Sequence, residues 1–187
     1  MNIKWSVNMF KQHVGFSFRI AQKRDIMHEG VGNRCADGTY VPFLDYDNTP
    51  IEWIYDEVKL VQDIFGLGNG YIFRTKHGHH VVFLDKMILG EVVQVLECTT
   101  VDTNYKKIPM MYGRRAWVLR HTNKSKEEIK YIGLVISEDC EDRERSNAHK
   151  LWLKRRYNVP DIHFDLGGWD DSIQLVKAFY PVPKESN

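Results

Sequence analysis

Residues 40–84 decide the fold, and they read YVPFLDYDNTPIEWIYDEVKLVQDIFGLGNGYIFRTKHGHHVVFL. Residues 40–47 are typical of a strand that runs into a polar turn at residues 48–50. Apolar residues then recur at 51, 54, 58, 61, 64 and 65, which predicts a helix over Ile51–Phe65 with Thr49 as a candidate cap. The glycines of residues 66–70 end this helix. Residues 71–74 and 81–84 predict two further strands around a polar centre at 75–80.

The flanking sequence supplies the remaining elements. Helices are expected over residues 86–96 and 141–157, strands over 117–120 and 129–137, a strand or short helix within 8–26, a loop over 30–39 and a short amphipathic run over 173–179. The order strand–helix–strand–strand–helix–strand indicates an α+β fold with a mixed or antiparallel sheet and flanking helices, ferredoxin-like or of the RNA-recognition type. A single domain over residues 1–187 is expected, with the motif-bearing core at about 40–137.

The composition restricts the class of protein. The chain has 187 residues, 43% hydrophobic and 27% charged, so it can bury a substantial core. Lys and Arg (26) nearly balance Asp and Glu (25), so net charge indicates no partner. No apolar run is long enough to cross a bilayer, the N-terminal residues lack a signal-peptide core, and no membrane partner is expected. Cys35, Cys98 and Cys140 are scattered and form no zinc motif, which favours a reducing, cytoplasmic location.

Two carboxylates at the end of the first predicted strand are candidate metal ligands. Asp45 and Asp47 are two residues apart, so their side chains emerge on one face of that strand. Mg²⁺ commonly takes one or two carboxylates together with substrate phosphate oxygens. Residues 47–50 are equally good turn and helix-cap chemistry, so a purely structural role for Asp47 remains an alternative.

The segment RTKHGHH at residues 74–80 is a candidate phosphate site. Strand alternation would divide its side chains between two faces, with Arg74, Lys76, Gly78 and His80 on one and Thr75, His77 and His79 on the other. Arginine binds phosphate through two parallel hydrogen bonds, and lysine binds it as a point charge. Gly78 would let a bulky ligand approach the backbone. The alternative is an exposed hairpin tip with no ligand.

These residues resemble the motifs of the archaeo-eukaryotic primase superfamily, the catalytic core of primases and primase-polymerases. That family has a hydrophobic strand ending in Asp-x-Asp, here FLDYD at residues 43–47, followed by a helix. A small residue-x-His motif before a hydrophobic strand follows, here GHHVVF at residues 78–83. Further on, Asp102 matches the third acid, and Arg120 with Lys124 resembles the family's nucleotide-binding basic pair.

The resemblance implies a metal-dependent nucleotidyltransferase that synthesises short strands on a single-stranded DNA template from nucleoside triphosphates. It implies Asp45, Asp47 and Asp102 as ligands of Mg²⁺ or Mn²⁺. It implies further residues that hold the triphosphate: His80, Arg120 and Lys124, with Arg74, Lys76 and Gly78 as additional candidates. A helicase or accessory subunit is a further expected partner. Two features depart from the family pattern, because Gly78 stands where serine is frequent and residues 103–107 after Asp102 are loop-like.

Two other functions fit the sequence. A replication-initiator or relaxase-type endonuclease would use a nucleophilic tyrosine, for which Tyr105, Tyr131 and Tyr157 are candidates, although the His-hydrophobic-His metal pair of such enzymes is absent. A nucleotide- or nucleic-acid-binding module without turnover is the other. Basic clusters with nearby aromatic residues suit either nucleic-acid contact or a solvated face: Lys106-Lys107, Arg114-Arg115 and Lys154-Arg155-Arg156, with Tyr112, Trp117 and Trp152 nearby.

Overall fold

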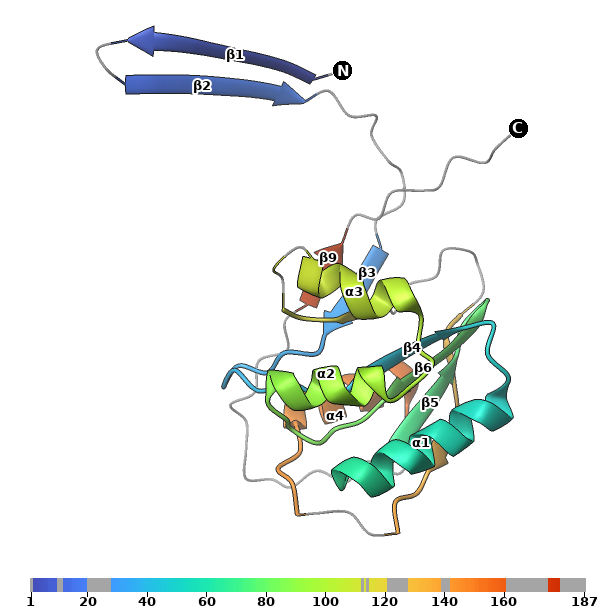
Figure 1. Cartoon of the computed structure of the whole chain (residues 1–187). Helices are drawn as coiled ribbons and strands as arrows, with labels where there is room; N and C mark the ends of the chain where they lie inside the picture. Colours follow the sequence, from blue (N-terminus) through green and yellow to red (C-terminus); the bar gives the residue numbers. More distant parts are fainter. Residues whose placement is uncertain are drawn as a thin grey trace.

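A four-stranded antiparallel sheet forms the centre of the computed structural model (Figure 1). The structure describes residues 2–9, 12–19, 28–111, 113, 115–120, 128–138, 142–160 and 175–178. The strands of the sheet lie in the order β4 (Phe43–Asp47), β6 (Gly78–Val82), β5 (Gly70–Arg74) and β8 (Lys130–Val135). This mixed α+β architecture with an antiparallel sheet confirms the predicted fold class.

Helix α1 (Ile51–Phe65) occupies the range that its apolar periodicity predicts. It ends at Gly66, whose left-handed backbone (φ 58°) favours glycine. The prediction that Thr49 caps the helix is wrong, because the hydroxyl of Thr49 donates to the carbonyl of Asp47 at 3.4 Å. The N-cap residue of α1 is Pro50, and the helix start has no side-chain cap hydrogen bond.

The other helices differ from expectation at their first residues. Helix α2 (Leu89–Glu97) begins three residues late, because Met87 is held in an extended bridge to Tyr40 and the carboxylate of Glu91 accepts the N–H of Ile88. Helix α4 (Asn147–Tyr157) begins after Ser146, whose side chain caps it, so the prediction of a helix from residue 141 is wrong at its start. Helix α3 (Thr103–Met111) was not predicted.

A second sheet joins segments far apart in the sequence. Its order is β7 (Val118–Arg120), β3 (His28–Gly32) and β9 (Leu175–Ala178), and both pairings are antiparallel. Strand β3 occupies the first residues of the predicted loop 30–39. A separate hairpin pairs β1 (Asn2–Met9) with β2 (Gln12–Arg19), which decides for a strand within residues 8–26.

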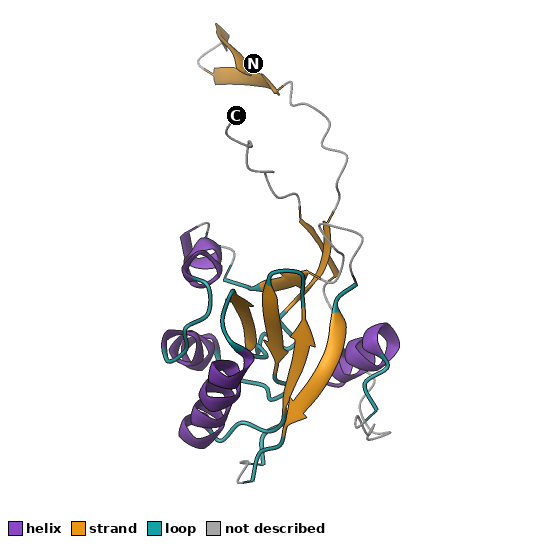
Figure 2. Ribbon diagram, turned by 90° about the vertical axis from the view of Figure 1, so that its right-hand side faces the viewer, coloured by secondary structure: helices purple, strands orange, loops and turns teal. Residues whose placement is uncertain are grey.

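Helices lie on both faces of the central sheet (Figure 2), and a hydrophobic cluster fills each of the two layers between helices and sheet. Helices α1 and α2 pack on one face over Leu44, Tyr46 and Ile72. Helix α4 packs on the opposite face, where Trp152 and Leu153 meet Phe43 and Phe73. Successive side chains of a strand therefore enter opposite layers, as Phe43 and Leu44 of β4 do.

Two expectations from composition can be compared with the described residues. None of the described helices is both long and apolar enough to cross a bilayer. Cys35 is buried and Cys98 exposed, and both are free thiols, while Cys140 lies outside the described residues.

Candidate functional site

Asp45 and His80 face each other across the pair of strands β4 and β6. The carbonyl of Asp45 points to the outer side of β4, so this pair is of the non-hydrogen-bonded type, in which opposed side chains come close. Nε2 of His80 lies 3.3 Å from Oδ1 of Asp45. His80 is only 4% exposed, whereas the Asp45 side chain is 23% exposed. The buried imidazole therefore lies beside a carboxylate that is partly open to solvent.

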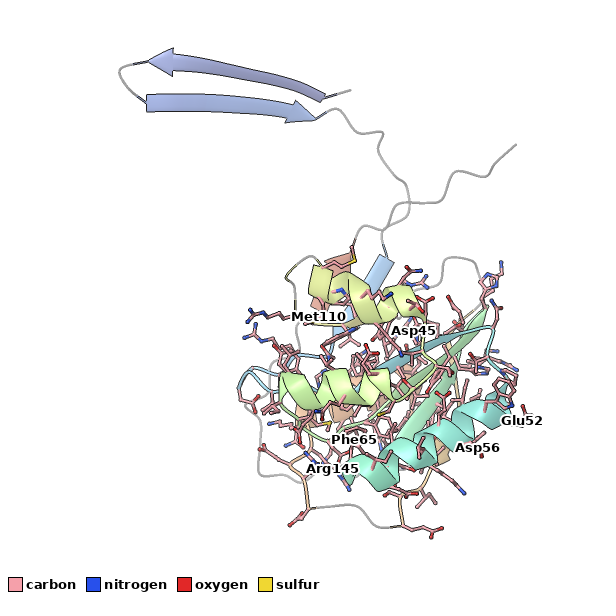
Figure 3. The ribbon with its side chains drawn as sticks, viewed as in Figure 1. Asp45, Glu52, Asp56, Phe65, Met110 and Arg145 are labelled. Carbon is pink, nitrogen blue, oxygen red and sulfur yellow. The ribbon has the colours of Figure 1, made fainter. Side chains whose placement is uncertain are left out.

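Asp102 lies directly beside Asp45, on the outer edge of β4. The backbone N–H of Asp102 donates to the Asp45 carbonyl at 2.9 Å, and Asp45 lies where β4 passes the start of α3 (Figure 3). Oδ1 of Asp102 accepts the N–H of Tyr105 at 2.8 Å, which makes Asp102 the N-cap of α3. The prediction of a loop over residues 103–107 is therefore wrong, because this cap starts a helix. One carboxylate oxygen of Asp102 is engaged by the cap.

Asp47 and Gly78 lie opposite each other at the end of the same strand pair. Asp47 is exposed and shares a face with Asp45, as the two-residue spacing predicts. A Cβ on Gly78 would collide with the carbonyl oxygen of Tyr46 and lie 2.8 Å from its carbonyl carbon. Gly78 thus makes room for the backbone of the neighbouring strand, where the sequence indicated room for a ligand.

Glu57 of α1 fixes the position of β4 from the other face of the sheet. Its Oε2 accepts from the Tyr46 hydroxyl at 3.0 Å and from the N–H of Thr100 at 2.8 Å. Burial and the charge of Glu57 raise the pKa of Tyr46 far above its usual range, so Tyr46 remains a neutral donor. One carboxylate therefore ties together α1, the strand of Asp45 and the segment that leads to Asp102.

Arg74 and Lys76 do not share a face with His80, so the alternation predicted over residues 74–80 is wrong. The chain turns at residues 75–77, where Thr75 and Gly78 exchange hydrogen bonds. Arg74 is paired with His79 across the turn and therefore faces the α1 side of the sheet, while His80 faces the α4 side. Lys76 is exposed in the turn itself. Burial, followed by the charges of Arg74 and His80, lowers the pKa of His79.

The predicted basic pair is described in part. Arg120 is the last residue of β7, is half-buried and pairs with Gly30 of β3. Strands β7 and β4 are in contact, which brings the strand of Arg120 beside that of Asp45. Lys124 lies outside the described residues.

The candidate nucleophilic tyrosines all lie partly within the packed interior. Tyr131 and Tyr157 pack against Phe73, with ring centroids 5.6 and 4.6 Å away. Burial raises the pKa of Tyr157 well above its usual range, which opposes formation of a nucleophilic phenolate. Tyr105 is half-buried near the start of α3.

The aromatic and basic clusters are divided between core and surface. Trp117 (1% exposed) and Trp152 (9%) belong to the core, so neither presents its ring to a base. Lys106 donates to the carbonyl of Thr99 at 2.7 Å. Arg155 is exposed in the last turn of α4. Tyr112 and Arg114 lie outside the described residues.

The carboxylates of the site suit a hard cation whose coordination is completed by oxygens of the substrate. Within the described ranges, no group of three His, Cys, Asp or Glu side chains gathers closely enough to hold a metal ion by itself. Asp45 and Asp47 nevertheless offer two carboxylates on one accessible strand face, and Mg²⁺ needs no more protein ligands where phosphates supply the rest. The second oxygen of Asp102 is a further donor beside Asp45.

Two buried polar pairs were missed by the sequence analysis. Nε2 of His149 donates to the carbonyl of Gly32 at 2.9 Å, and its Nδ1 lies 2.7 Å from the Ser146 hydroxyl. The carboxylate of Asp85 accepts the N–H of Gly68 at 3.0 Å and lies 3.6 Å from Nε of Arg145. Only the Ser-x-x-His spacing at a helix start was a local signal for either pair.

No family model, curated protein or solved structure matches the chain. The function proposed below therefore rests on the geometry of the site and on the motif resemblance.

Proposed function

We propose that this chain is a metal-dependent nucleotidyltransferase of the primase-polymerase type, which joins nucleoside triphosphates on a single-stranded DNA template. The observation that carries the proposal is the meeting of three motif residues from distant parts of the sequence. His80 of β6 lies 3.3 Å from Oδ1 of Asp45 in β4, and the backbone N–H of Asp102, before α3, donates to the Asp45 carbonyl. The proximity of these three motif residues supports the proposal.

The residues of the site have distinct roles in this proposal. Asp45 and Asp47 hold the divalent cation, Mg²⁺ or Mn²⁺, with the second oxygen of Asp102 beside them. The bound cation supplies charge neutralisation and alignment for phosphoryl transfer. His80 is a positioning residue, because its Nε2 lies 3.3 Å from Oδ1 of Asp45. Arg120 at the end of β7 is the basic residue that this arrangement offers to the triphosphate.

The two rival functions are less well supported. A tyrosine nucleophile would have to act from a partly buried ring, and for Tyr157 burial also raises the pKa. A binding module without turnover would need no second acidic residue beside Asp45, whereas the backbone N–H of Asp102 donates to the Asp45 carbonyl. Covalent attachment of the protein to DNA would favour the first rival, and nucleotide binding without incorporation would favour the second.

The test is incorporation of labelled nucleotides by the purified chain with single-stranded template and Mn²⁺ or Mg²⁺, with and without primer. Asp45→Asn keeps an acceptor for His80 but removes the charge, and the rate should fall on the order of 10²–10³-fold. Asp102→Asn retains helix capping, since asparagine caps as well as aspartate. Its rate should fall by roughly tenfold or more while the midpoint of thermal unfolding, Tm, stays unchanged.

The matched control is Asp63→Asn, which removes an exposed carboxylate from α1 on the other face of the sheet. It should incorporate nucleotides at the wild-type rate. Wild-type activity in Asp45→Asn, or the same loss in Asp63→Asn, would exclude the proposed site. Absence of products from the wild-type chain under all of these conditions would exclude the proposed reaction for the isolated protein.

A further inference from the structure

Three basic side chains lie in register across three neighbouring strands of the central sheet. Lys130 of β8 is paired with Arg74 of β5, and Arg74 is paired with His79 of β6. Residues that are directly opposed in a sheet project from the same face, so the three side chains form a row across the strands. Lys130 and Arg74 are exposed, and His79 is half-buried.

This row, Lys130–Arg74–His79, has no neutralising carboxylate. In the part of the chain that the structure describes, no acidic side chain forms an ion pair with Arg74 or Lys130. Glu128, two residues before Lys130, forms none with it either. Like charges directly opposite each other in a sheet are destabilising. The lowered pKa of His79 reflects the same repulsion from Arg74, in addition to burial.

The turn between β5 and β6 extends the positive surface beyond the ends of the strands. Lys76 and His77 are exposed in this turn, next to Arg74 in the sequence. With neighbouring strands about 4.8 Å apart, the row from Lys130 to His79 is roughly 10 Å long. Even at the close spacing of a duplex, where each strand carries about one phosphate per 3.4 Å of axis, the row is longer than the distance between neighbouring phosphates, so it can contact more than one.

The row is separate from the site around Asp45. Asp45 and His80 face the α4 side of the sheet, whereas Arg74, which pairs with His79, faces the α1 side. A triphosphate held beside Asp45 and a ligand on the row would therefore occupy opposite faces. The row must accordingly serve a ligand other than that triphosphate.

We propose that Arg74, Lys76, His79 and Lys130 form a binding surface for the phosphate backbone of a single-stranded nucleic acid, which they hold without reading its bases. Arg74, Lys76 and Lys130 are exposed cations, which suit repeated phosphates. Sequence-independent binding of this kind is electrostatic and sensitive to salt. The inference goes beyond the proposed enzymatic activity, because it requires neither nucleotide nor metal.

The experiment measures binding of a fluorescein-labelled 20-nucleotide oligo(dT) by anisotropy, with EDTA and without nucleotides, between 50 and 200 mM NaCl. Arg74→Ala with Lys130→Ala should weaken binding about tenfold or more. Loss of two phosphate contacts should also reduce the slope of log K against log salt concentration by about 1.4. Arg74→Gln with Lys130→Gln keeps the side-chain length and should weaken binding similarly.

The matched control, Lys59→Ala with Arg155→Ala, removes the same charge from exposed positions on α1 and α4. Its affinity should stay within about twofold of wild type. Unchanged affinity and slope in the row variants, or an equal loss in the control, would overturn the proposal. So would tighter binding of labelled polyglutamate than of oligo(dT), which would assign the row to an acidic protein. Because no nucleotide is present, an inactive enzyme can still pass this test.

Discussion

Replacement of Gly78 by serine is a stringent test of the strand pairing that brings Asp45 to His80. Serine is frequent at the matching position of the primase superfamily, so Gly78→Ser would restore a hydroxyl that the resemblance implies is missing. The close approach of β4 to Gly78 predicts instead that the substitution lowers both stability and activity. The new Cβ would lie 2.8 Å from the carbonyl carbon of Tyr46 and 3.0 Å from Cα of Asp47, and would collide with the carbonyl oxygen of Tyr46.

The size of the effect follows from these contacts. The atoms that obstruct the Cβ belong to the backbone, so β4 must move until the 2.8 Å separation reaches the 3.4 Å at which ordinary contact begins. Overpacking of this kind costs about 1–3 kcal/mol. Loss of glycine's backbone freedom in the unfolded chain returns roughly 0.5–1 kcal/mol. Because backbone atoms obstruct the new Cβ, we expect the upper half of the overpacking range, about 2–3 kcal/mol. The net loss of about 1–2.5 kcal/mol would lower Tm by roughly 2–10 °C for a chain of this length.

The assay is thermal unfolding followed by circular dichroism, together with nucleotide incorporation at a temperature where both proteins are folded. Gly90→Ala is the control, since Gly90 is exposed in α2 and a Cβ there meets no atom within 4 Å. It should raise stability by up to about 1 kcal/mol. The Gly78→Ser protein should lose activity as well as stability, because movement of β4 separates Asp45 from His80.

A Gly78→Ser protein with wild-type Tm would refute the inferred close approach of the strands. If the Gly78→Ser protein had wild-type stability and higher activity, the serine hydroxyl would be inferred to contact the substrate. That result would restore the ligand-binding role that the sequence suggested for residue 78.

Two further predictions concern buried polar groups. Burial raises the pKa of Asp85, so its contribution to stability is complete at acidic pH and is lost as pH rises through the folded-state pKa. Asp85→Asn can still accept a hydrogen bond from Gly68. Its free energy of unfolding in urea, relative to that of the wild type, should therefore increase between pH 4 and 7. A difference between the two proteins that does not change with pH would contradict this. Ser146→Ala removes the cap of α4 and the hydroxyl that lies 2.7 Å from Nδ1 of His149. The free energy of unfolding should fall by about 1–3 kcal/mol in the same assay. A decrease below about 0.5 kcal/mol would argue against the interaction between Ser146 and His149.

The success of the sequence analysis depended on how local each determinant is. Helix α1 was predicted residue for residue because its apolar stripe is continuous and ends at Gly66. Helix α3 was missed because Pro109 lies within it and few of its side chains enter the core. Pairing of β3 with β9 joins His28 to Ala178, and no local pattern can indicate such a contact.

In the candidate site, too, the features set by local sequence were predicted and those set by tertiary structure were not. The two-residue spacing was sufficient to place Asp45 and Asp47 on one face, and the motif resemblance selected His80 and Asp102, which both contact Asp45. The faces of Arg74 and Lys76 were predicted wrongly because alternation was continued through residues that form a turn. Because of this turn, Arg74 shares a face with His79 and not with His80. The position of the turn is seen only from the hydrogen bonds between Thr75 and Gly78.

The inversion has a chemical consequence for the proposed activity. If Arg74 shared a face with Asp45, its guanidinium would be one strand pair away from a carboxylate that is required to bind a cation. Arginine pairs readily with carboxylates, and an ion pair of this kind would compete with the metal for the oxygens of Asp45. The turn at residues 75–77 instead places Arg74 on the other side of the sheet, and His80 is the residue that faces Asp45. One hairpin thus places Arg74 and the acidic pair on opposite faces, as the two proposed binding sites require.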